Sequence, residues 1–143
     1  MIVKLLPMDI PRYWEAIKFC CEQADEVDSK YLPRYLNELL QTLLNDKAQC
    51  FARFSEAKEL EAMAITRIIY NKQMDENYLY IQCLYSWVPK RDSVWKEEVV
   101  FMKRFAQSTG CKYIGTMTRV GRAQDILRSV GFEENTRIYA MRV

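Results

Sequence analysis

The C-terminal part of the chain constrains the fold most strongly. Residues 111–118 are rich in β-favouring side chains, and residues 122–130 carry apolar side chains at the spacing of a short helix. A Gly-Phe pair, Gly131 and Phe132, ends that helix, and residues 136–143 alternate in the manner of a strand. This part of the chain is therefore predicted to fold as strand, helix, turn and closing strand.

Seven further elements are predicted before this region. They are a strand at 2–6, a helix capped by Asp9, a Leu-rich helix from about Tyr31 to Asn45, strands at 49–55, 63–70 and 78–87, and a helix from Asp92 or Ser93 to about Ser108. Three consecutive strands suggest an antiparallel meander. The Leu-rich helix is typical of a core-facing helix, and the alternative is a helix that binds a partner.

The composition fits one domain spanning residues 1–143. Half of the residues are hydrophobic, 28% are charged, and no apolar run is long enough to cross a membrane. We therefore expect no association with a membrane. The N-terminal residues lack the long apolar stretch and small-residue cleavage site of a signal peptide, so a cytoplasmic location is expected.

Histidine is absent, and this excludes several classes of enzyme. Without it the chain has no Ser-His-Asp or Cys-His catalysis and no His-based zinc site, so no metal is expected. Acid–base chemistry must then come from Glu, Asp, Tyr, Lys, Cys or water. The five cysteines include no C-x-x-C pair and are odd in number, which predicts small buried apolar groups rather than a disulfide framework.

Charge is unevenly distributed along the chain. Residues 1–89 hold 10 Lys/Arg and 13 Asp/Glu, whereas residues 90–143 hold 11 Lys/Arg and 6 Asp/Glu. The basic second half could attract an anionic ligand such as a nucleotide-like cofactor, and the alternative is ordinary surface charge. The basic residues form no dense run, which disfavours nucleic acid as a partner.

The pattern R-A-x-x-x-L-x-x-x-G-F at residues 122–132, followed by a strand, resembles the closing segment of the GCN5-related N-acetyltransferases (GNAT). The predicted order β-α-α-β-β-β-α-β-α-β is also the order of that fold, so the resemblance covers essentially the whole chain. It implies an α/β protein with a mixed sheet and a GNAT-like acyl-CoA N-acyltransferase fold. It also implies acetyl-CoA as cofactor and an amine as acceptor.

The resemblance places the cofactor pyrophosphate at the loop and helix start that follow the fourth strand. The candidate cofactor-binding residues are Trp87, Val88, Lys90, Arg91, Ser93, Val94 and Lys96. A helix N-terminus suits an anion because its N–H groups are free. The glycines usual in this loop are absent, since Val94 and Lys96 occupy their positions, and Asp92 adds a negative charge. The alternative is an ordinary capped helix after a Pro-containing loop.

The catalytic positions implied by the resemblance also differ from the usual pattern. The fourth strand has no Asp or Glu, and Gln82 lies where a base is often found. Leu127 stands at the position of the tyrosine that can protonate the leaving thiolate, and leucine cannot donate a proton. The remaining candidates for catalysis are Gln82, Tyr85 and Tyr139, each of which has packing as its alternative role.

Two functions follow from the resemblance. The first is an acetyl-CoA-dependent N-acetyltransferase, in which backbone N–H groups near Trp87 and Val88 polarise the thioester carbonyl. The alternative is a catalytically inactive GNAT-fold protein that binds a partner, of the kind that some tailed bacteriophages encode. A splay between strands 78–87 and 111–118 would leave room for pantetheine, whereas full pairing with Trp87 or Trp95 in the gap would argue against an enzyme.

Overall fold

The computed structural model describes all residues, 1–143. The elements in chain order are β1 (Ile2–Leu5), a 3-10 turn η1 (Pro7–Asp9), α1 (Ile10–Ala24), α2 (Leu32–Leu44), β2 (Gln49–Phe54), β3 (Leu60–Asn71), β4 (Glu76–Ser86), α3 (Asp92–Ser108), β5 (Cys111–Thr116) and α4 (Gly121–Ser129). The predicted order is confirmed from the first strand to α4. The predicted meander is confirmed as β2–β3–β4.

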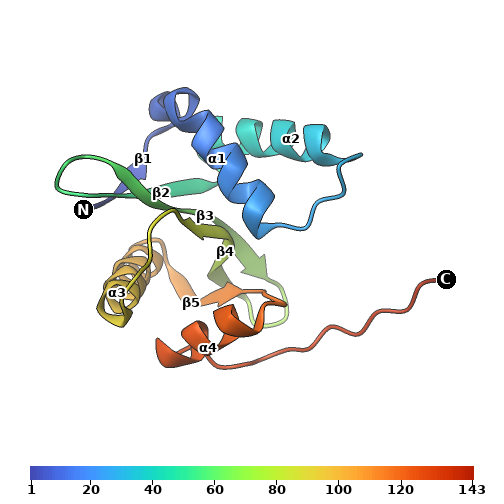
Figure 1. Ribbon diagram of the computed structural model, residues 1–143. Coiled ribbons are helices and arrows are strands. Elements are labelled where there is room, and N and C mark those ends of the chain that lie inside the picture. Colours follow the sequence, from blue (N-terminus) through green and yellow to red (C-terminus); the bar gives the residue numbers. More distant parts are fainter.

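One mixed sheet forms the centre of the molecule, in the order β1-β2-β3-β4-β5. Neighbours are antiparallel from β1 to β4, and β4 runs parallel to β5. Helices α1 and α2 cover one face of the sheet, and α3 and α4 lie on the other (Figure 1). This is the mixed α/β arrangement that the sequence predicted.

A hydrophobic core lies on each face of the sheet. On the first face, Ile17 of α1 and Leu39 of α2 are buried against Met63 of β3. Burying a side chain of this size contributes about 1.5–3 kcal/mol. Leu39 and Leu43 of the Leu-rich helix are buried, so its predicted core-facing role is confirmed.

The cysteines belong to these cores. All five are buried free thiols, as predicted. Burial raises the pKa of the Cys50 thiol to about 12. Ionising this group therefore opposes folding.

The predicted closing strand is wrong. Residues 133–143 form no helix or strand, and in Figure 1 this segment runs away from the rest of the molecule. At the end of α4, Phe132 N–H donates to Leu127 O (2.9 Å) and Gly131 N–H donates to Arg128 O (3.1 Å). These two bonds are a Schellman motif, and Gly131 supplies the positive φ of +101° that it needs. The turn predicted at Gly131 and Phe132 is thus confirmed, but the segment beyond it meets no strand.

No helix of the structure is both long and apolar enough to pass through a membrane.

Candidate active site

Strands β4 and β5 separate part of the way along β4. Their pairing runs from Asn77 to Ile81, where the last pair is Ile81 with Thr116. At that point Thr116 Oγ1 donates to Ile81 O at 3.0 Å. β4 continues to Ser86 without β5 beside it. The splay that the sequence could not establish is therefore present, and one edge of β4 is open beyond Ile81.

A β-bulge lies at the point of separation. Ile65 of β3 faces Cys83, but the next residue, Thr66, faces Ile81, so Gln82 has no partner on β3. A bulge bends its strand and increases the local twist. We attribute the divergence of β4 from β5 to this extra residue, because the pairing ends immediately before it.

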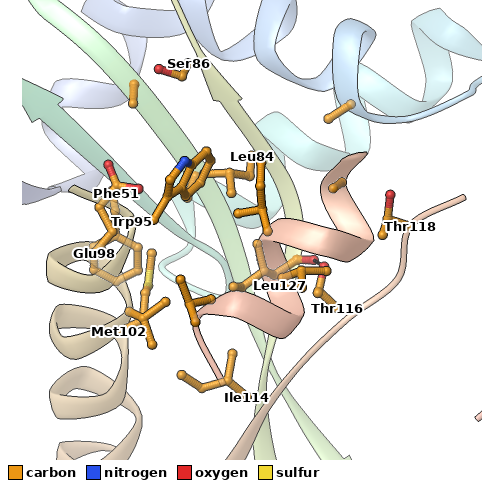
Figure 2. Close-up of a pocket in the computed structure, with 18 of the residues that line it drawn as sticks. Phe51, Leu84, Ser86, Trp95, Glu98, Met102, Ile114, Thr116, Thr118 and Leu127 are labelled. Carbon is orange, nitrogen blue, oxygen red and sulfur yellow. Dashed lines mark hydrogen bonds between the residues drawn. The ribbon is translucent and has the colours of Figure 1, made fainter. Parts of the chain in front are cut away.

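A cavity of about 320 Å³ occupies the space between the sheet, α3 and α4. Hydrophobic residues form 20 of the 27 positions that line it. Figure 2 shows Leu84 of β4, Trp95 and Met102 of α3, and Leu127 of α4 around it. This volume and apolar lining are typical of a small-molecule site. Trp95 forms part of the wall and leaves the cavity open.

The backbone donors of β4 differ from those predicted. Trp87 N–H already donates to Glu61 O of β3 at 2.8 Å, so it is not free to polarise a carbonyl. N–H groups of consecutive residues in an antiparallel strand point to opposite edges. Leu84 and Ser86 therefore direct their N–H groups toward the open edge, and both residues line the cavity. The expected role of the Trp87 N–H is therefore wrong, and that of the Val88 N–H stays a prediction.

Gln82 is the predicted catalytic candidate that reaches the cavity. Its Nε2 donates to Tyr35 Oη at 2.7 Å, and its Oε1 accepts from Arg67 Nε at 2.8 Å. Because these bonds involve both ends of the amide, they fix its orientation. One Nε2 hydrogen and one Oε1 lone pair remain for another partner.

Behind Gln82 lies a carboxylate that the sequence reasoning missed. Tyr35 of α2 donates a hydrogen bond to Asp25, and Cys83 Sγ lies 3.5 Å from the same Asp25 oxygen. Burial, and next the bond to Asp25, raise the pKa of Tyr35, so its hydroxyl keeps its proton. Asp25 stands in the polar break before α2, and no local pattern connects it with Gln82. Their proximity comes from packing α2 onto the sheet.

The other two catalytic candidates lie outside the cavity. Tyr85 packs edge-on against Phe19 of α1 and against Trp87, with ring centroids 5.3 and 5.2 Å away. It belongs to the core on the opposite face of the sheet. Tyr139 is 87% exposed on the C-terminal segment. Within one chain, the structure brings neither tyrosine to Gln82.

The start of α3 also differs from the prediction. The N-cap is Arg91, the helix begins at Asp92, and no side chain caps it. The expected cap at Asp92 or Ser93 is therefore wrong. The first N–H groups of an uncapped helix lack partners and lie at the positive end of its dipole. Ser93 and Lys96 line a second hollow beside this helix, outside the main cavity.

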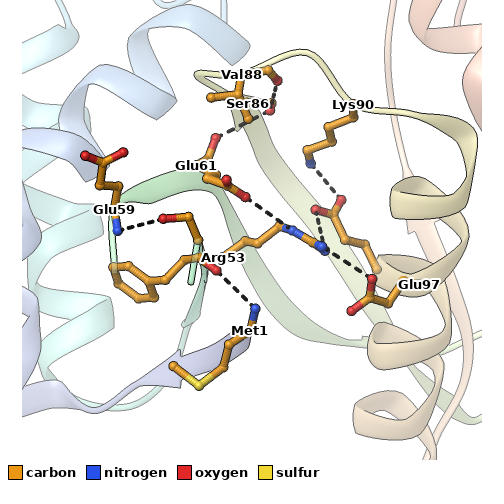
Figure 3. Close-up of polar contacts among 11 residues, drawn as sticks. Met1, Arg53, Glu59, Glu61, Ser86, Val88, Lys90 and Glu97 are labelled. Carbon is orange, nitrogen blue, oxygen red and sulfur yellow. Dashed lines mark hydrogen bonds and ion pairs between the residues drawn. The ribbon is translucent and has the colours of Figure 1, made fainter. Parts of the chain in front are cut away.

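Lys90 points inward instead of toward this helix start. Its ammonium is 2.7 Å from Glu98, its side chain is 3% exposed, and it lies 4.1 Å from the centre of the Trp95 ring. Burial lowers the pKa of Lys90, although the bond to Glu98 partly counteracts this. Figure 3 shows Lys90 and Arg53 meeting the glutamates of α3. Lys90 therefore serves an internal ion pair.

Of the remaining cofactor candidates, Arg91 and Val94 lie in the first turn of α3 or just before it, and Val88 is 40% exposed in the preceding loop. Their contact with a cofactor stays a prediction. No group of three or more His, Cys, Asp or Glu side chains is placed to hold a metal ion.

Comparisons with known proteins add to this geometry. No protein-family model matches the chain, and no curated protein matches it. Among solved structures, the aminoglycoside antibiotic 6'-N-acetyltransferase AAC(6')-Ih from Acinetobacter baumannii is similar, with a TM-score of 0.73 and 13% identity over 100% of this chain and 97% of that chain.

Two further solved structures are similar to this chain. The ribosomal-protein-alanine N-acetyltransferase from Brucella melitensis biovar Abortus 2308 has a TM-score of 0.70 and 12% identity, over 100% of this chain and 99% of that one. AAC(6')-Iy, in complex with the bisubstrate analog CoA-S-monomethyl-acetylneamine, has a TM-score of 0.69 and 17% identity, over 100% and 97%. The chain therefore has the GNAT fold that its closing segment predicted.

Proposed function

We propose that this protein is an acetyl-CoA-dependent N-acetyltransferase that acts on an amine. The splay of β4 from β5 beside an apolar cavity of about 320 Å³ carries this proposal. An apolar cavity beside an open strand edge suits an acyl chain and its thioester. The likeness to AAC(6')-Iy, which was solved with a CoA-containing bisubstrate analog, supports this assignment.

Each part of the site has a role in this reaction. Acetyl-CoA would supply an activated thioester, and its acyl transfer needs mainly positioning and charge stabilisation. The N–H groups of Leu84 and Ser86 would donate to the carbonyl oxygen, and the apolar walls would exclude water. The free amide positions of Gln82 would hold the amine or a water molecule, while Tyr35 and Asp25 keep that amide oriented.

The anionic end of the cofactor would bind at the start of α3. Arg91 and the uncapped N–H groups of the first turn provide positive charge there. Arg91→Glu should weaken acetyl-CoA binding at least tenfold, about 1.4 kcal/mol. Lys103→Glu, an exposed substitution nearer the other end of α3, is the matched control and should leave affinity within about twofold.

Isothermal calorimetric titration with acetyl-CoA, with CoA as the comparison ligand, tests the proposal directly. Ala123→Trp, which places a large side chain in the cavity wall on α4, should abolish binding. Arg122→Trp, on the exposed side of the same helix, should not. Micromolar binding that Ala123→Trp removes would support the enzyme, and a screen of amines for acetylation would follow.

The alternative is an inactive GNAT-fold protein that binds a partner. Two observations favour it: the loop has no glycine, and Lys90 is buried against Glu98 instead of facing solvent. Absence of binding at millimolar acetyl-CoA, with the protein shown to be folded by circular dichroism, would select this alternative.

A further inference from the structure

Arg67 of β3 is a partly buried cation without an anionic partner in the chain. The other partly buried lysines and arginines, Lys4, Lys18, Arg53 and Lys90, each form an ion pair with a carboxylate. Every other lysine or arginine that lacks such a pair is exposed, where water solvates its charge. Withdrawing a charge from water is costly unless an opposite charge offsets it. The counter-charge for Arg67 is therefore expected to come from a ligand.

The guanidinium of Arg67 has donors to spare. Its Nε donates to Gln82 Oε1 at 2.8 Å, and neither Nη atom forms a hydrogen bond in the chain. Neither Nη atom is closed off from solvent, so both are open to a ligand. The N–H groups of a guanidinium lie in one plane, in a fork that matches the two oxygens of a carboxylate.

The guanidinium lies beside the part of the site proposed to hold the amine. Arg67 is opposite Tyr80 in the β3–β4 pairing, and Gln82 follows on β4 at the bulge where β5 separates. Gln82 lines the cavity together with Gln23 and Ala24 at the end of α1. Because Arg67 contacts Gln82 directly, an anion on its Nη atoms would lie next to an amine held by the Gln82 amide.

The charges around Gln82 favour a carboxylate over a phosphate as that anion. Tyr35 links Gln82 to the Asp25 carboxylate, which repels a further negative charge. No other partly buried cation is left unpaired to help hold a phosphate, whose charge approaches two. A carboxylate carries a single charge, and a guanidinium binds it through two parallel N–H···O bonds.

We propose that the acceptor is an α-amino acid, whose amine is held by Gln82 and whose carboxylate is bound by Arg67. This inference rests on the proposed acetyltransferase function and names its substrate class. The amine nitrogen forms an amide bond to the acetyl carbon as the carbon–sulfur bond of the thioester breaks, and the amine proton ends on the CoA sulfur. The products are an N-acetylamino acid and CoA.

Acceptors that differ only in the carboxylate give the first test. Each proteinogenic amino acid is compared with the amine that lacks its α-carboxylate, for example phenylalanine with phenethylamine and serine with ethanolamine. Acetylated product is measured by mass spectrometry at saturating acetyl-CoA. For the amino acid used best, kcat/KM should exceed that of its matching amine at least tenfold, about 1.4 kcal/mol. Equal values, or a preference for the amine, overturn the proposal.

Arg67→Met separates binding of the carboxylate from support of Gln82. The variant loses both, so turnover of both acceptors should fall, but the ratio of their kcat/KM values should drop to within about twofold of one. An unchanged ratio would mean that Arg67 only orients Gln82, and the proposal would be wrong. Arg67→Lys keeps the charge without the fork and should lower the ratio at least threefold, which provides the test if Arg67→Met does not fold. Arg12→Met, an exposed position in the first turn of α1, is the matched control and should leave the ratio unchanged.

Calorimetric titration with acetyl-CoA distinguishes failure of this inference from failure of the proposed function. A protein that binds acetyl-CoA and acetylates amines without regard to the carboxylate retains the function and refutes the role of Arg67. A protein that binds acetyl-CoA but acetylates no amino acid refutes the substrate class. A folded protein that binds no acetyl-CoA refutes both.

Discussion

An ion network around Arg53 links α3 to the sheet, and removing Arg53 should lower the free energy of unfolding. Arg53 of β2 lies 3.6 Å from Glu61 of β3 and 3.3 and 3.8 Å from Glu97 and Glu98 of α3. Lys90 completes the network through Glu98 (Figure 3). The Arg53 and Glu98 side chains are each 15% exposed, so water does little to screen this pair.

The expected effect of Arg53→Met follows from these distances. With an effective dielectric constant of about 20, a unit-charge pair 3.8 Å apart attracts by about 4 kcal/mol. Desolvation offsets much of this gain in the native protein, but the substitution leaves the partly exposed Glu61 without its cation and the buried Glu98 with Lys90 alone. Breaking such a network from one side should lower the free energy of unfolding by about 3 kcal/mol. Glu97 is 60% exposed and should contribute little.

The mechanism is tested by removing the whole network. The triple variant Arg53→Met, Lys90→Met, Glu98→Leu removes the three most buried charges of the network. Of the charges around Arg53, only the partly exposed Glu61 and the exposed Glu97 remain. Replacing buried ion networks by apolar residues is often neutral or stabilising. The triple variant should therefore recover to within about 1 kcal/mol of the wild-type protein.

Urea denaturation followed by circular dichroism measures both effects, provided that the slope of unfolding free energy against urea is unchanged. Arg34→Met is the matched control, because Arg34 pairs with Glu38 on the surface of α2, where the two side chains are 79% and 64% exposed. It should cost less than about 0.5 kcal/mol. If Arg53→Met is no more destabilising than Arg34→Met, the argument from burial is refuted.

Three further predictions concern stability. Burial raises the pKa of Cys50 from 9.0 to about 12, so above pH 9 the unfolded chain releases a proton that the folded chain keeps, and stability falls with pH. Cys50→Ala should reduce that fall by about 1.4 kcal/mol per pH unit between pH 9 and 11, measured by urea denaturation. Equal slopes of unfolding free energy against pH in the variant and the wild-type protein would contradict this prediction. Gly131→Ala should lower the free energy of unfolding by about 1 kcal/mol, the cost of a positive φ, and should lower the melting temperature accordingly. Gly121 has open space and no positive φ, so Gly121→Ala should not lower the melting temperature. Tyr35→Phe removes the part-buried hydroxyl that donates to Asp25 and leaves Cys83 Sγ as its neighbour, so it should lower the free energy of unfolding by about 1–3 kcal/mol, and an unchanged melting temperature would contradict this.

Local patterns were sufficient to predict most of the fold. Apolar spacing and turn residues such as Gly131 determine the helices and strands up to α4 without reference to distant parts of the chain. The closing strand could not be placed in the same way, because the alternation of Ile138 to Val143 describes a strand but not the edge that it joins. A strand also needs a partner, and residues 133–143 pair with no strand in this structure.

The site was harder to predict because its geometry depends on contacts between distant residues. The splay starts where the β3–β4 register shifts at Gln82, which is a property of two strands together. The Asp25 carboxylate reaches Gln82 only because Tyr35 of α2 lies between them. Gln82 itself was found because the family resemblance pointed to the middle of β4.

The two loop positions where glycine is usual, Val94 and Lys96, lie in a helix in this protein, so the absence of glycine there has a structural explanation. Val94 and Lys96 already lie within α3, since the helix begins at Asp92, so glycine at these positions would weaken a helix instead of opening a loop. The close approach of an anion to backbone N–H groups must then occur one turn earlier, around Arg91 and Asp92, where no side chain caps the helix. Lys90 is tied to Glu98, and Asp92 opposes an anion, so Arg91 is the basic side chain that stands at the helix start. The sign and size of the effect of Arg91→Glu therefore decide whether this helix start binds a diphosphate or only begins a helix.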